Sequence, residues 1–307
     1  MSFNEGAGLD VSQVVSGRGG AVVGGGIGGL ILMLVIVFLG GNPLAGSGLG
    51  DPSDLFVSGQ GDSVDLSECR TGADANRSDV CRIVGTVNSV QDYWRDALPQ
   101  DIGVQYRDAQ TVIFSGSTQS QCGTATSATG PFYCPGDERV YIDAGFFDEL
   151  SGTYGADGGN LAQMYVVAHE YGHHVQQILN ILARAHDGQT GPQSAGVRVE
   201  LMADCFAGVW AHHAANTQDA QGNTLIMPLT EADIRSALSA ASAVGDDHIQ
   251  GEVARGQVKP ETWTHGSSES RQKWFLSGYE AGSLNHCDTF ATNNLCERTT
   301  RLKSGWF

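Results

Sequence analysis

The stretch Val166-Val-Ala-His169-Glu170-Tyr-Gly-His173-His-Val175 sets the fold expected for the whole chain. On a helix, residues four positions apart lie one turn above each other, so His169 and His173 can bind one metal ion from the same side. Glu170 then flanks that ion and can reach a water molecule beside it. This is the physical content of the His-Glu-x-x-His pattern of zinc peptidases. Five residues also match ordinary helices by chance, so the pattern needs support from the rest of the chain.

This stretch lies inside the longest helical pattern of the sequence, residues 161–185. Breaker-rich runs precede and follow the pattern, as expected at helix ends. Apolar residues cover most of its faces, which predicts a buried helix. Gly172 inside a helix costs about 1 kcal/mol relative to alanine, which indicates close packing at that position.

A catalytic zinc needs three protein ligands and one open position for water. The metzincin branch would require glycine and histidine where the chain has Gln176 and Leu179, so that branch is excluded. A second predicted helix, residues 197–215, carries Glu200 and, one turn later, Asp204 among apolar residues. Such an acidic pair needs a cation or hydrogen-bond partners. We expect Glu200 to be the third ligand and Asp204 to accept the other ring N–H of a ligating histidine.

The expected chemistry is hydrolysis by metal-activated water. The metal lowers the pKa of the water, Glu170 accepts its proton as general base, and hydroxide attacks a polarised carbonyl. His265 lies in a loop before a helix predicted to begin at residue 267 or 268 and to end near residue 281. This histidine is a candidate to stabilise the oxyanion, with a structural role as the alternative. His265 and Asp137 also remain alternatives to Glu200 as third ligand.

Charge and composition divide the chain into regions. The chain has 307 residues and a formal net charge of −17, and an acidic chain repels phosphate, which excludes nucleic acid as a partner. Residues 1–19 are small and polar and predict a disordered tail. Residues 42–65 are rich in Gly, Ser, Pro and Asp and predict a flexible linker. The zinc metallopeptidase domain then covers residues 66–307.

Residues 20–41 carry no charge and end in a strongly apolar run, long enough to cross a bilayer core of roughly 30 Å as a transmembrane helix. A cleaved signal peptide and a glycine-rich buried segment are the alternatives. Arg18 precedes the run and the next basic residue is Arg70, so the positive-inside rule predicts a cytoplasmic N-terminus. The catalytic domain would then be extracellular or periplasmic, on a bacterial cell membrane. Gly24 and Gly28 have the spacing of a weak helix-pairing signal, which allows a homo-oligomer.

The cysteines favour an oxidising compartment. Cys205 lies inside an apolar helical pattern and is expected to be a buried free thiol. The other six form sequence-local couples that we expect to be disulfides: Cys69 with Cys81, Cys122 with Cys134, and Cys287 with Cys296.

The remaining patterns predict a helix-rich α+β fold with a small β-sheet. Further helices are expected over residues 80–98 and 230–244. Residues 111–115 and 139–143 are predicted strands, and a bridge between Cys122 and Cys134 would pin the loop between them into a hairpin-like unit.

Four segments together resemble the bacterial neutral zinc metallopeptidase family. The likeness spans roughly residues 66–285. It implies a zincin-like active-site helix, a Zn²⁺ ion on His169, His173 and Glu200, a catalytic Glu170, and one N-terminal membrane span. In zincins the edge strand before this helix often binds extended peptide, which by analogy indicates residues 140–143. The segments are His169-Glu-Tyr-Gly-His173-His-Val-Gln176, Cys122-Gly-Thr-Ala-Thr-Ser-Ala-Thr-Gly-Pro-Phe-Tyr-Cys134, Glu200-Leu-Met-Ala-Asp204-Cys205, and His265-Gly-Ser-Ser268 with Arg271, Trp274, Phe275 and Gly278.

We therefore expect a membrane-anchored zinc metallopeptidase that cleaves a peptide or protein substrate. Two other interpretations stay open. One is a non-catalytic, membrane-anchored zinc-binding or assembly module, and the other is a zinc amidase acting on cell-wall peptides. Glu170 favours catalysis, because a structural zinc site has no need of a general base.

Overall fold

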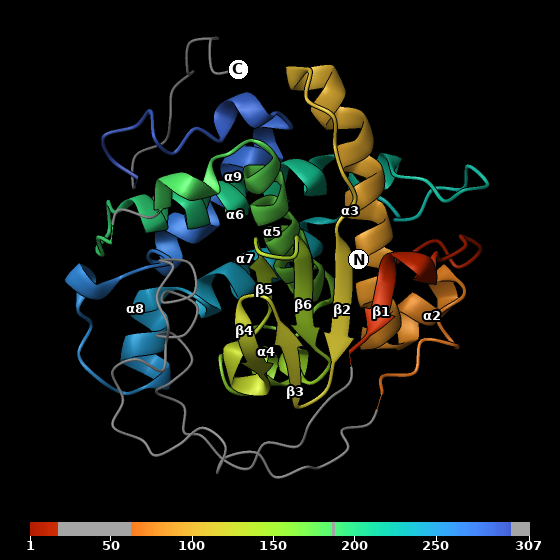
Figure 1. Cartoon of the computed structure of the whole chain (residues 1–307), viewed down its shortest axis with the longest axis horizontal. Coiled ribbons are helices and arrows are strands. Elements are labelled where there is room, and N and C mark those ends of the chain that lie inside the picture. Colours follow the sequence, from red (N-terminus) through yellow and green to blue (C-terminus); the bar gives the residue numbers. More distant parts are fainter. Residues whose placement is uncertain (18–62, 186–187, 296–307) are drawn as a thin grey trace.

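A central sheet and a group of packed helices form the molecule (Figure 1). The computed structural model describes residues 1–17, 63–185 and 188–295. The sheet has the strand order β1-β2-β6-β5, and a separate pair is formed by β3 and β4. The strands of the four-stranded sheet are β1 (Val14–Ser16), β2 (Gln110–Phe114), β5 (Phe132–Cys134) and β6 (Arg139–Asp143). The separate pair consists of β3 (Ser117–Ser120) and β4 (Gly123–Thr126).

The five predicted helices begin within two residues of the expected positions, and the short helices at residues 72–77, 146–152 and 246–248 were not predicted. The active-site helix α5 is shorter than expected, because the chain leaves the helix after Ile178 and makes a separate 3-10 turn at Leu182–Ala185. The helices are α2 (Gly72–Arg77), α3 (Asp79–Ile102), α4 (Phe146–Gly152), α5 (Asn160–Ile178), α6 (Ala195–His213), α7 (Glu231–Ala243), α8 (Asp246–His248) and α9 (Ser268–Ala281), and a π-helical turn spans Ile249–Val253. The helix-rich α+β fold is confirmed.

The two predicted strands do not form a hairpin-like unit. β2 and β6 pair in parallel, with Thr111 opposite Val140. The intervening chain forms the antiparallel pair β3–β4 and then β5, which pairs antiparallel with β6. Alternating apolar residues specify a strand but not its partner, so the pairing was not predictable from these two patterns.

Small residues let three helices approach closely. A Cβ atom on Gly172 of α5 would lie 3.0 Å from the backbone of Ala203 on α6. Gly208 of α6 and Gly278 of α9 face each other's helix backbones, at Phe275 and Cys205, too closely for any side chain. The close packing indicated by Gly172 is thus confirmed, since it brings α6 against the active-site helix, and Gly208 and Gly278 bring α9 against α6.

The predicted disordered N-terminal tail is wrong for residues 1–17. Phe3 and Val14 are buried, and β1 pairs in parallel with β2. The backbone N–H of Phe3 donates to the Asn76 side chain over 2.8 Å, and the Asn76 amide donates back to the Phe3 carbonyl over 3.0 Å. Disorder was predicted from the average composition of the segment. Such an average does not detect the few residues that are buried or hydrogen-bonded.

The membrane topology expected from the sequence is also corrected. In the parts of the chain that the structure describes, no helix combines the length and the apolar character needed to cross a membrane. The predicted span, with Gly24 and Gly28, and residues 42–62 of the predicted linker lie outside those parts. β1 precedes the predicted span and β2 follows it, yet the two strands pair in one sheet. A single-pass topology would hold them on opposite sides of the bilayer, so single-pass anchoring with an external domain is not supported.

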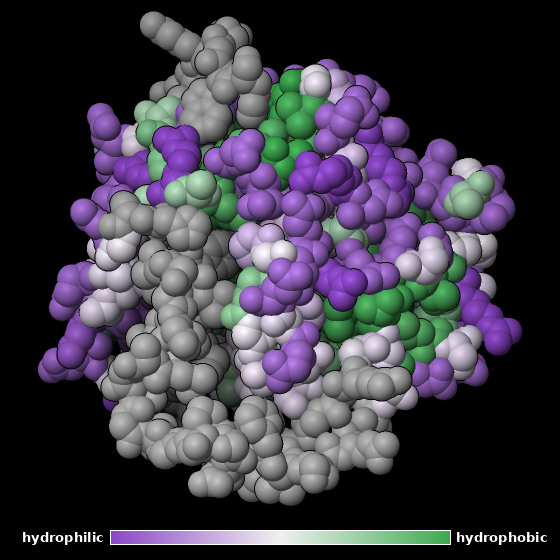
Figure 2. Space-filling model, in the orientation of Figure 1, coloured by the Kyte–Doolittle hydropathy of each residue, from purple (hydrophilic) through white to green (hydrophobic). Residues whose placement is uncertain are grey.

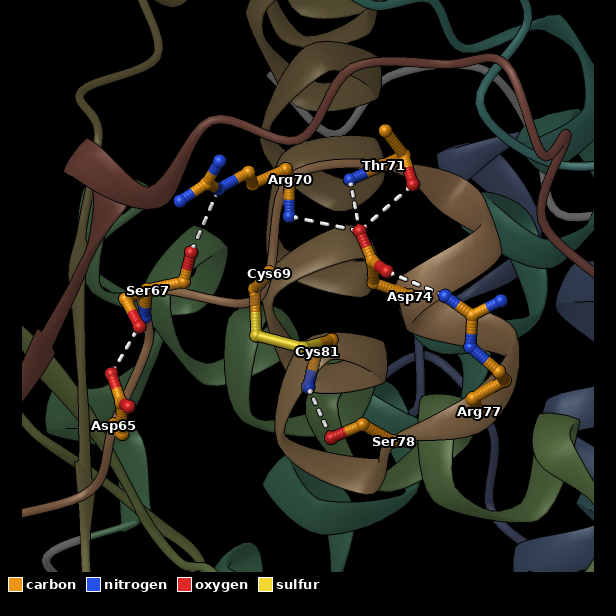
Figure 3. Close-up of a disulfide and its surroundings, with 9 residues drawn as sticks. All are labelled: Asp65, Ser67, Cys69, Arg70, Thr71, Asp74, Arg77, Ser78 and Cys81. Carbon is orange, nitrogen blue, oxygen red and sulfur yellow. Dashed lines mark hydrogen bonds and ion pairs between the residues drawn. A yellow bond between two sulfur atoms is a disulfide. The ribbon is translucent and has the colours of Figure 1, made fainter.

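Two of the three predicted disulfides are confirmed, and the third is wrong. Cys69–Cys81 joins the segment before α2 to the first turn of α3 (Figure 3), and Cys122–Cys134 joins the β3–β4 turn to the end of β5. Cys287 pairs with Cys205 of α6, with a Cα–Cα distance of 5.5 Å, so Cys205 is not a free thiol. Its expected partner, residue 296, lies outside the described residues.

The face of the molecule seen in Figure 2 is mostly hydrophilic, in agreement with the net charge of −17. Hydrophobic residues gather on this face over β1 and α2. The N-terminal segment lies at this place, and its Val11 is 39% exposed.

Candidate metal centre

Three side chains from two helices converge at one point. His169 and His173 lie one turn apart on α5, and Glu200 lies on the neighbouring α6. The two Nε2 atoms are 3.1 Å apart, and the Glu200 carboxylate oxygens lie 3.2 Å from His169 Nε2 and 3.5 Å from His173 Nε2. All three residues are buried, and their ligating atoms lie within 4.8 Å of one another. The three side chains predicted as ligands therefore lie close enough together to bind one metal ion.

Neighbouring groups determine which nitrogen of each histidine carries hydrogen. The side-chain N–H of Gln176 donates to the Val199 carbonyl over 2.7 Å. The side-chain oxygen of Gln176 therefore faces His173 Nδ1, at 2.9 Å, and is the acceptor there. The carboxylate of Asp204 lies 2.8 Å from His169 Nδ1. Each Nδ1 therefore donates, and in the neutral ring each Nε2 keeps its lone pair.

This arrangement fits a cation. Two Nε2 lone pairs 3.1 Å apart would repel each other unless a proton or a metal ion lies between them, and the adjacent Glu200 carboxylate adds negative charge. Zinc–ligand distances near 2.0–2.2 Å at tetrahedral angles give ligand–ligand separations of about 3.3–3.6 Å, close to the spacings observed here. Imidazole nitrogen and carboxylate oxygen are donors that zinc accepts. The donor set, its spacing and its charge thus fit a zinc ion.

A buried charge network supports His169 from behind. Asp204 accepts two hydrogen bonds of 2.9 Å from the Arg271 guanidinium of α9, and one of 2.5 Å from the Tyr165 hydroxyl. Burial raises the pKa of the Asp204 carboxyl, but Arg271 and His169 outweigh burial and lower that pKa to about 2. Asp204 is therefore an anion at neutral pH, and it orients the His169 ring as the sequence predicts.

Glu170 lines the same cleft as the three candidate ligands and is itself outside that cluster. Its side chain is buried, and burial raises the pKa of its carboxyl, although His169 and His173 oppose the shift. A carboxylate that is easier to protonate is better suited to accept a proton from water at neutral pH.

His265 also lines the cleft. Asp246 fixes this loop, because one of its carboxylate oxygens accepts the backbone N–H groups of residues 264, 265 and 266 over 2.7–2.9 Å. The other oxygen lies 3.5 Å from His265 Nδ1. Burial lowers the pKa of His265, but Asp246 and Glu200 outweigh burial and raise it, so the ring keeps its charged donor form to higher pH than a free imidazole does.

Asp137 is not part of the metal centre. Its carboxylate accepts the Tyr141 hydroxyl over 2.7 Å and the Gln121 backbone N–H over 3.1 Å. It is absent from the residues that line the cleft. Asp137 is therefore excluded as the third ligand, and Glu200 is favoured over it.

The predicted substrate strand is corrected. β6 lies between β2 and β5, and β5 pairs with residues 139–141, so β6 is not the edge strand of this sheet. The outer strand beside α5 is β5, whose Phe132 lines the cleft together with Gly130 and Pro131. The error arose because β5 is only three residues long and its sequence was assigned to a loop.

Three residues that support the site were not predicted to do so. They are Arg271 and Tyr165, which donate to Asp204, and Asp246, which holds the His265 loop. A signal for Arg271 existed, since it precedes Trp274 and Phe275 by three and four positions and so shares their buried face of α9. A charged side chain on such a face requires a buried partner. Nothing in the local sequence of Tyr165 or Asp246 distinguishes them from core or surface residues.

Two histidines one turn apart on one helix and a glutamate from the next helix thus form a buried cluster that could hold a metal ion. The chain belongs to the family described as "Putative neutral zinc metallopeptidase", whose model matches residues 7–290. It is 51% identical over 232 residues to an uncharacterized protein of Mycobacterium tuberculosis, covering 75% of this chain and 77% of that protein. It is 37% identical over 273 residues to the uncharacterized Escherichia coli protein YpfJ, covering 86% and 87%. No solved structure matches the chain.

Proposed function

We propose that this protein is a zinc-dependent peptidase in which His169, His173 and Glu200 hold the metal and Glu170 is the general base. The convergence of two imidazole lone pairs and one carboxylate in a buried cleft carries this proposal. A structural zinc site closes its shell with four protein ligands. The cluster found among the described residues offers three, which leaves a position for water.

Each residue then has a distinct role. A bound zinc ion would supply a Lewis acid that acidifies water and polarises the substrate carbonyl. Glu170 accepts the proton of the attacking water and passes it to the leaving amine. His265, held by Asp246, donates a hydrogen bond to the carbonyl oxygen as negative charge develops there.

The decisive variant is Glu170→Gln, which has the same shape and no basic carboxylate. We expect the variant to keep zinc and to lose at least ~100-fold in hydrolysis rate, in line with the usual contribution of a general base. The assay incubates the zinc-loaded full chain with a peptide mixture and separately with muropeptides, and mass spectrometry identifies the products. Equal cleavage by wild type and variant would refute the mechanism. Cleavage of muropeptides alone would replace peptidase activity by amidase activity.

A further inference from the structure

Apolar side chains form part of the lining of the cleft that holds the metal centre, and together they make up its apolar wall. The space in the cleft, open solvent included, is about 800 Å³. The wall residues come from β5, α4, α5 and the chain around α7 and α8, so distant parts of the sequence build it together. They are Phe132, Phe146, Tyr154, Val166, Val244 and Ile249.

The wall begins one helical turn from the reacting groups. Val166 precedes Glu170 by one turn of α5, so the two side chains lie on the same face, about 5–6 Å apart. A substrate residue whose carbonyl faces Glu170 thus has the wall within reach of its own or its neighbour's side chain. Ile249, which also lines the cleft, begins the π-helical turn, and such turns are frequent at functional sites.

The charged groups of the cleft all belong to the metal centre or its support. Arg271 is engaged by Asp204, and Glu200 faces the two histidines. A charged substrate side chain placed against the wall would lose its hydration without gaining a partner, which costs free energy. A bulky apolar side chain would instead be removed from water.

We propose that this wall is a specificity subsite for a large apolar or aromatic side chain next to the scissile bond. The substrate class is then peptides with Phe, Leu, Ile or Met at that position. The inference rests on the proposed peptidase function and deepens it.

Matched fluorogenic peptides test the preference. They differ only in one flanking residue, which is Phe, Leu, Ala, Asp or Lys. We expect kcat/KM for the zinc-loaded full chain to be at least ~10-fold higher for Phe or Leu than for Ala, and lowest for Asp and Lys. Binding of the uncleaved Phe and Ala peptides to zinc-loaded Glu170→Gln protein should show the same order by calorimetry.

A negative charge placed in the wall should weaken the preference for Phe over Lys. Ile249→Asp puts a carboxylate at a partly exposed position of the wall, and it should lower the Phe/Lys ratio of kcat/KM at least ~10-fold. Val258→Asp is the matched control, because Val258 is 44% exposed and does not line the cleft. Val244→Phe provides a second variant, which narrows the cleft and should favour Ala over Phe.

The outcomes separate the two proposals. Zinc-dependent cleavage with no apolar preference, or with Ile249→Asp behaving like Val258→Asp, would overturn the subsite and leave the peptidase function intact. Selective binding of the Phe peptide to Glu170→Gln protein, without cleavage of any peptide by wild type, would support the subsite as a binding site and overturn the peptidase function.

Discussion

Arg271 and Asp204 form a buried, doubly hydrogen-bonded ion pair directly behind His169. Both hydrogen bonds are 2.9 Å long, and the two side chains are 4% and 0% exposed. The pair joins α9 to α6, and the Asp204 carboxylate joins both to α5 through His169. The metal centre is thus held by charge as well as by helix packing.

Loss of Arg271 should destabilise the whole fold. Arg271→Met keeps most of the volume but leaves the Asp204 carboxylate buried without its counterion, which typically costs about 3–5 kcal/mol. We expect a clearly lower urea midpoint in equilibrium unfolding followed by circular dichroism. Arg235→Met is the control, because its partner Glu231 is 95% exposed and such pairs contribute little. Equal midpoints for the two variants would show that the buried pair is not a stabilising element.

Zinc content distinguishes the two carboxylates that the sequence allows as third ligand. Glu200→Ala should weaken zinc binding by more than about 100-fold, because losing a ligand costs more than the 10–100-fold typical of a supporting residue. Asp137→Ala should retain zinc, since Asp137 is bound to Tyr141 instead. Metal analysis after dialysis against a graded zinc buffer measures both. If Asp137→Ala lost zinc and Glu200→Ala kept it, Asp137 and not Glu200 would be the third zinc ligand.

Local patterns predicted much of the site because its parts are local. The spacing of His169 and His173 is a property of one helix turn, and the pair of Glu200 and Asp204 is a property of another. The prediction that these two pairs lie together also used the argument that buried acidic side chains need a cation. The structure adds the reason the helices can meet, since a Cβ atom on Gly172 would lie only 3.0 Å from the backbone of Ala203 on α6.

The errors concern contacts between residues far apart in the chain. The pairing of β1 with β2 joins residues 14–16 to residues 111–113, and no local periodicity encodes such a partner. The third disulfide shows the same limit, because Cys287 was assigned to the cysteine nearest in sequence. In the fold its neighbour is Cys205, 82 positions away.

The disulfide between Cys205 and Cys287 can be tested chemically. Non-reducing proteolysis and mass spectrometry should recover a peptide pair that contains these two cysteines. Cys287→Ser should lower stability by about 4 kcal/mol, the chain-entropy value for a loop of this length, measured by urea unfolding. Cys296→Ser is the matched control, and it should preserve both the peptide pair and the urea midpoint. Recovery of Cys287 linked to Cys296 instead would refute the pairing.

The N-terminal segment should be an integral part of the domain, and the contact between Phe3 and Gly85 tests this. A Cβ atom on Gly85 would lie 2.6 Å from the Phe3 ring, so the ring occupies the space that the missing side chain leaves on α3. Phe3→Ala should cost about 3–5 kcal/mol, as expected for a buried phenylalanine.

Gly85→Ala should destabilise the wild-type chain, because the ring and the new methyl group collide. In the Phe3→Ala background the collision is absent, and alanine favours the helix over glycine by about 1 kcal/mol. Gly85→Ala should therefore be neutral or stabilising there, and a double-mutant cycle by urea unfolding measures the coupling. Additive effects of the two substitutions would mean that Phe3 does not pack on Gly85. The contact that best supports residues 1–17 as part of the domain would then be absent.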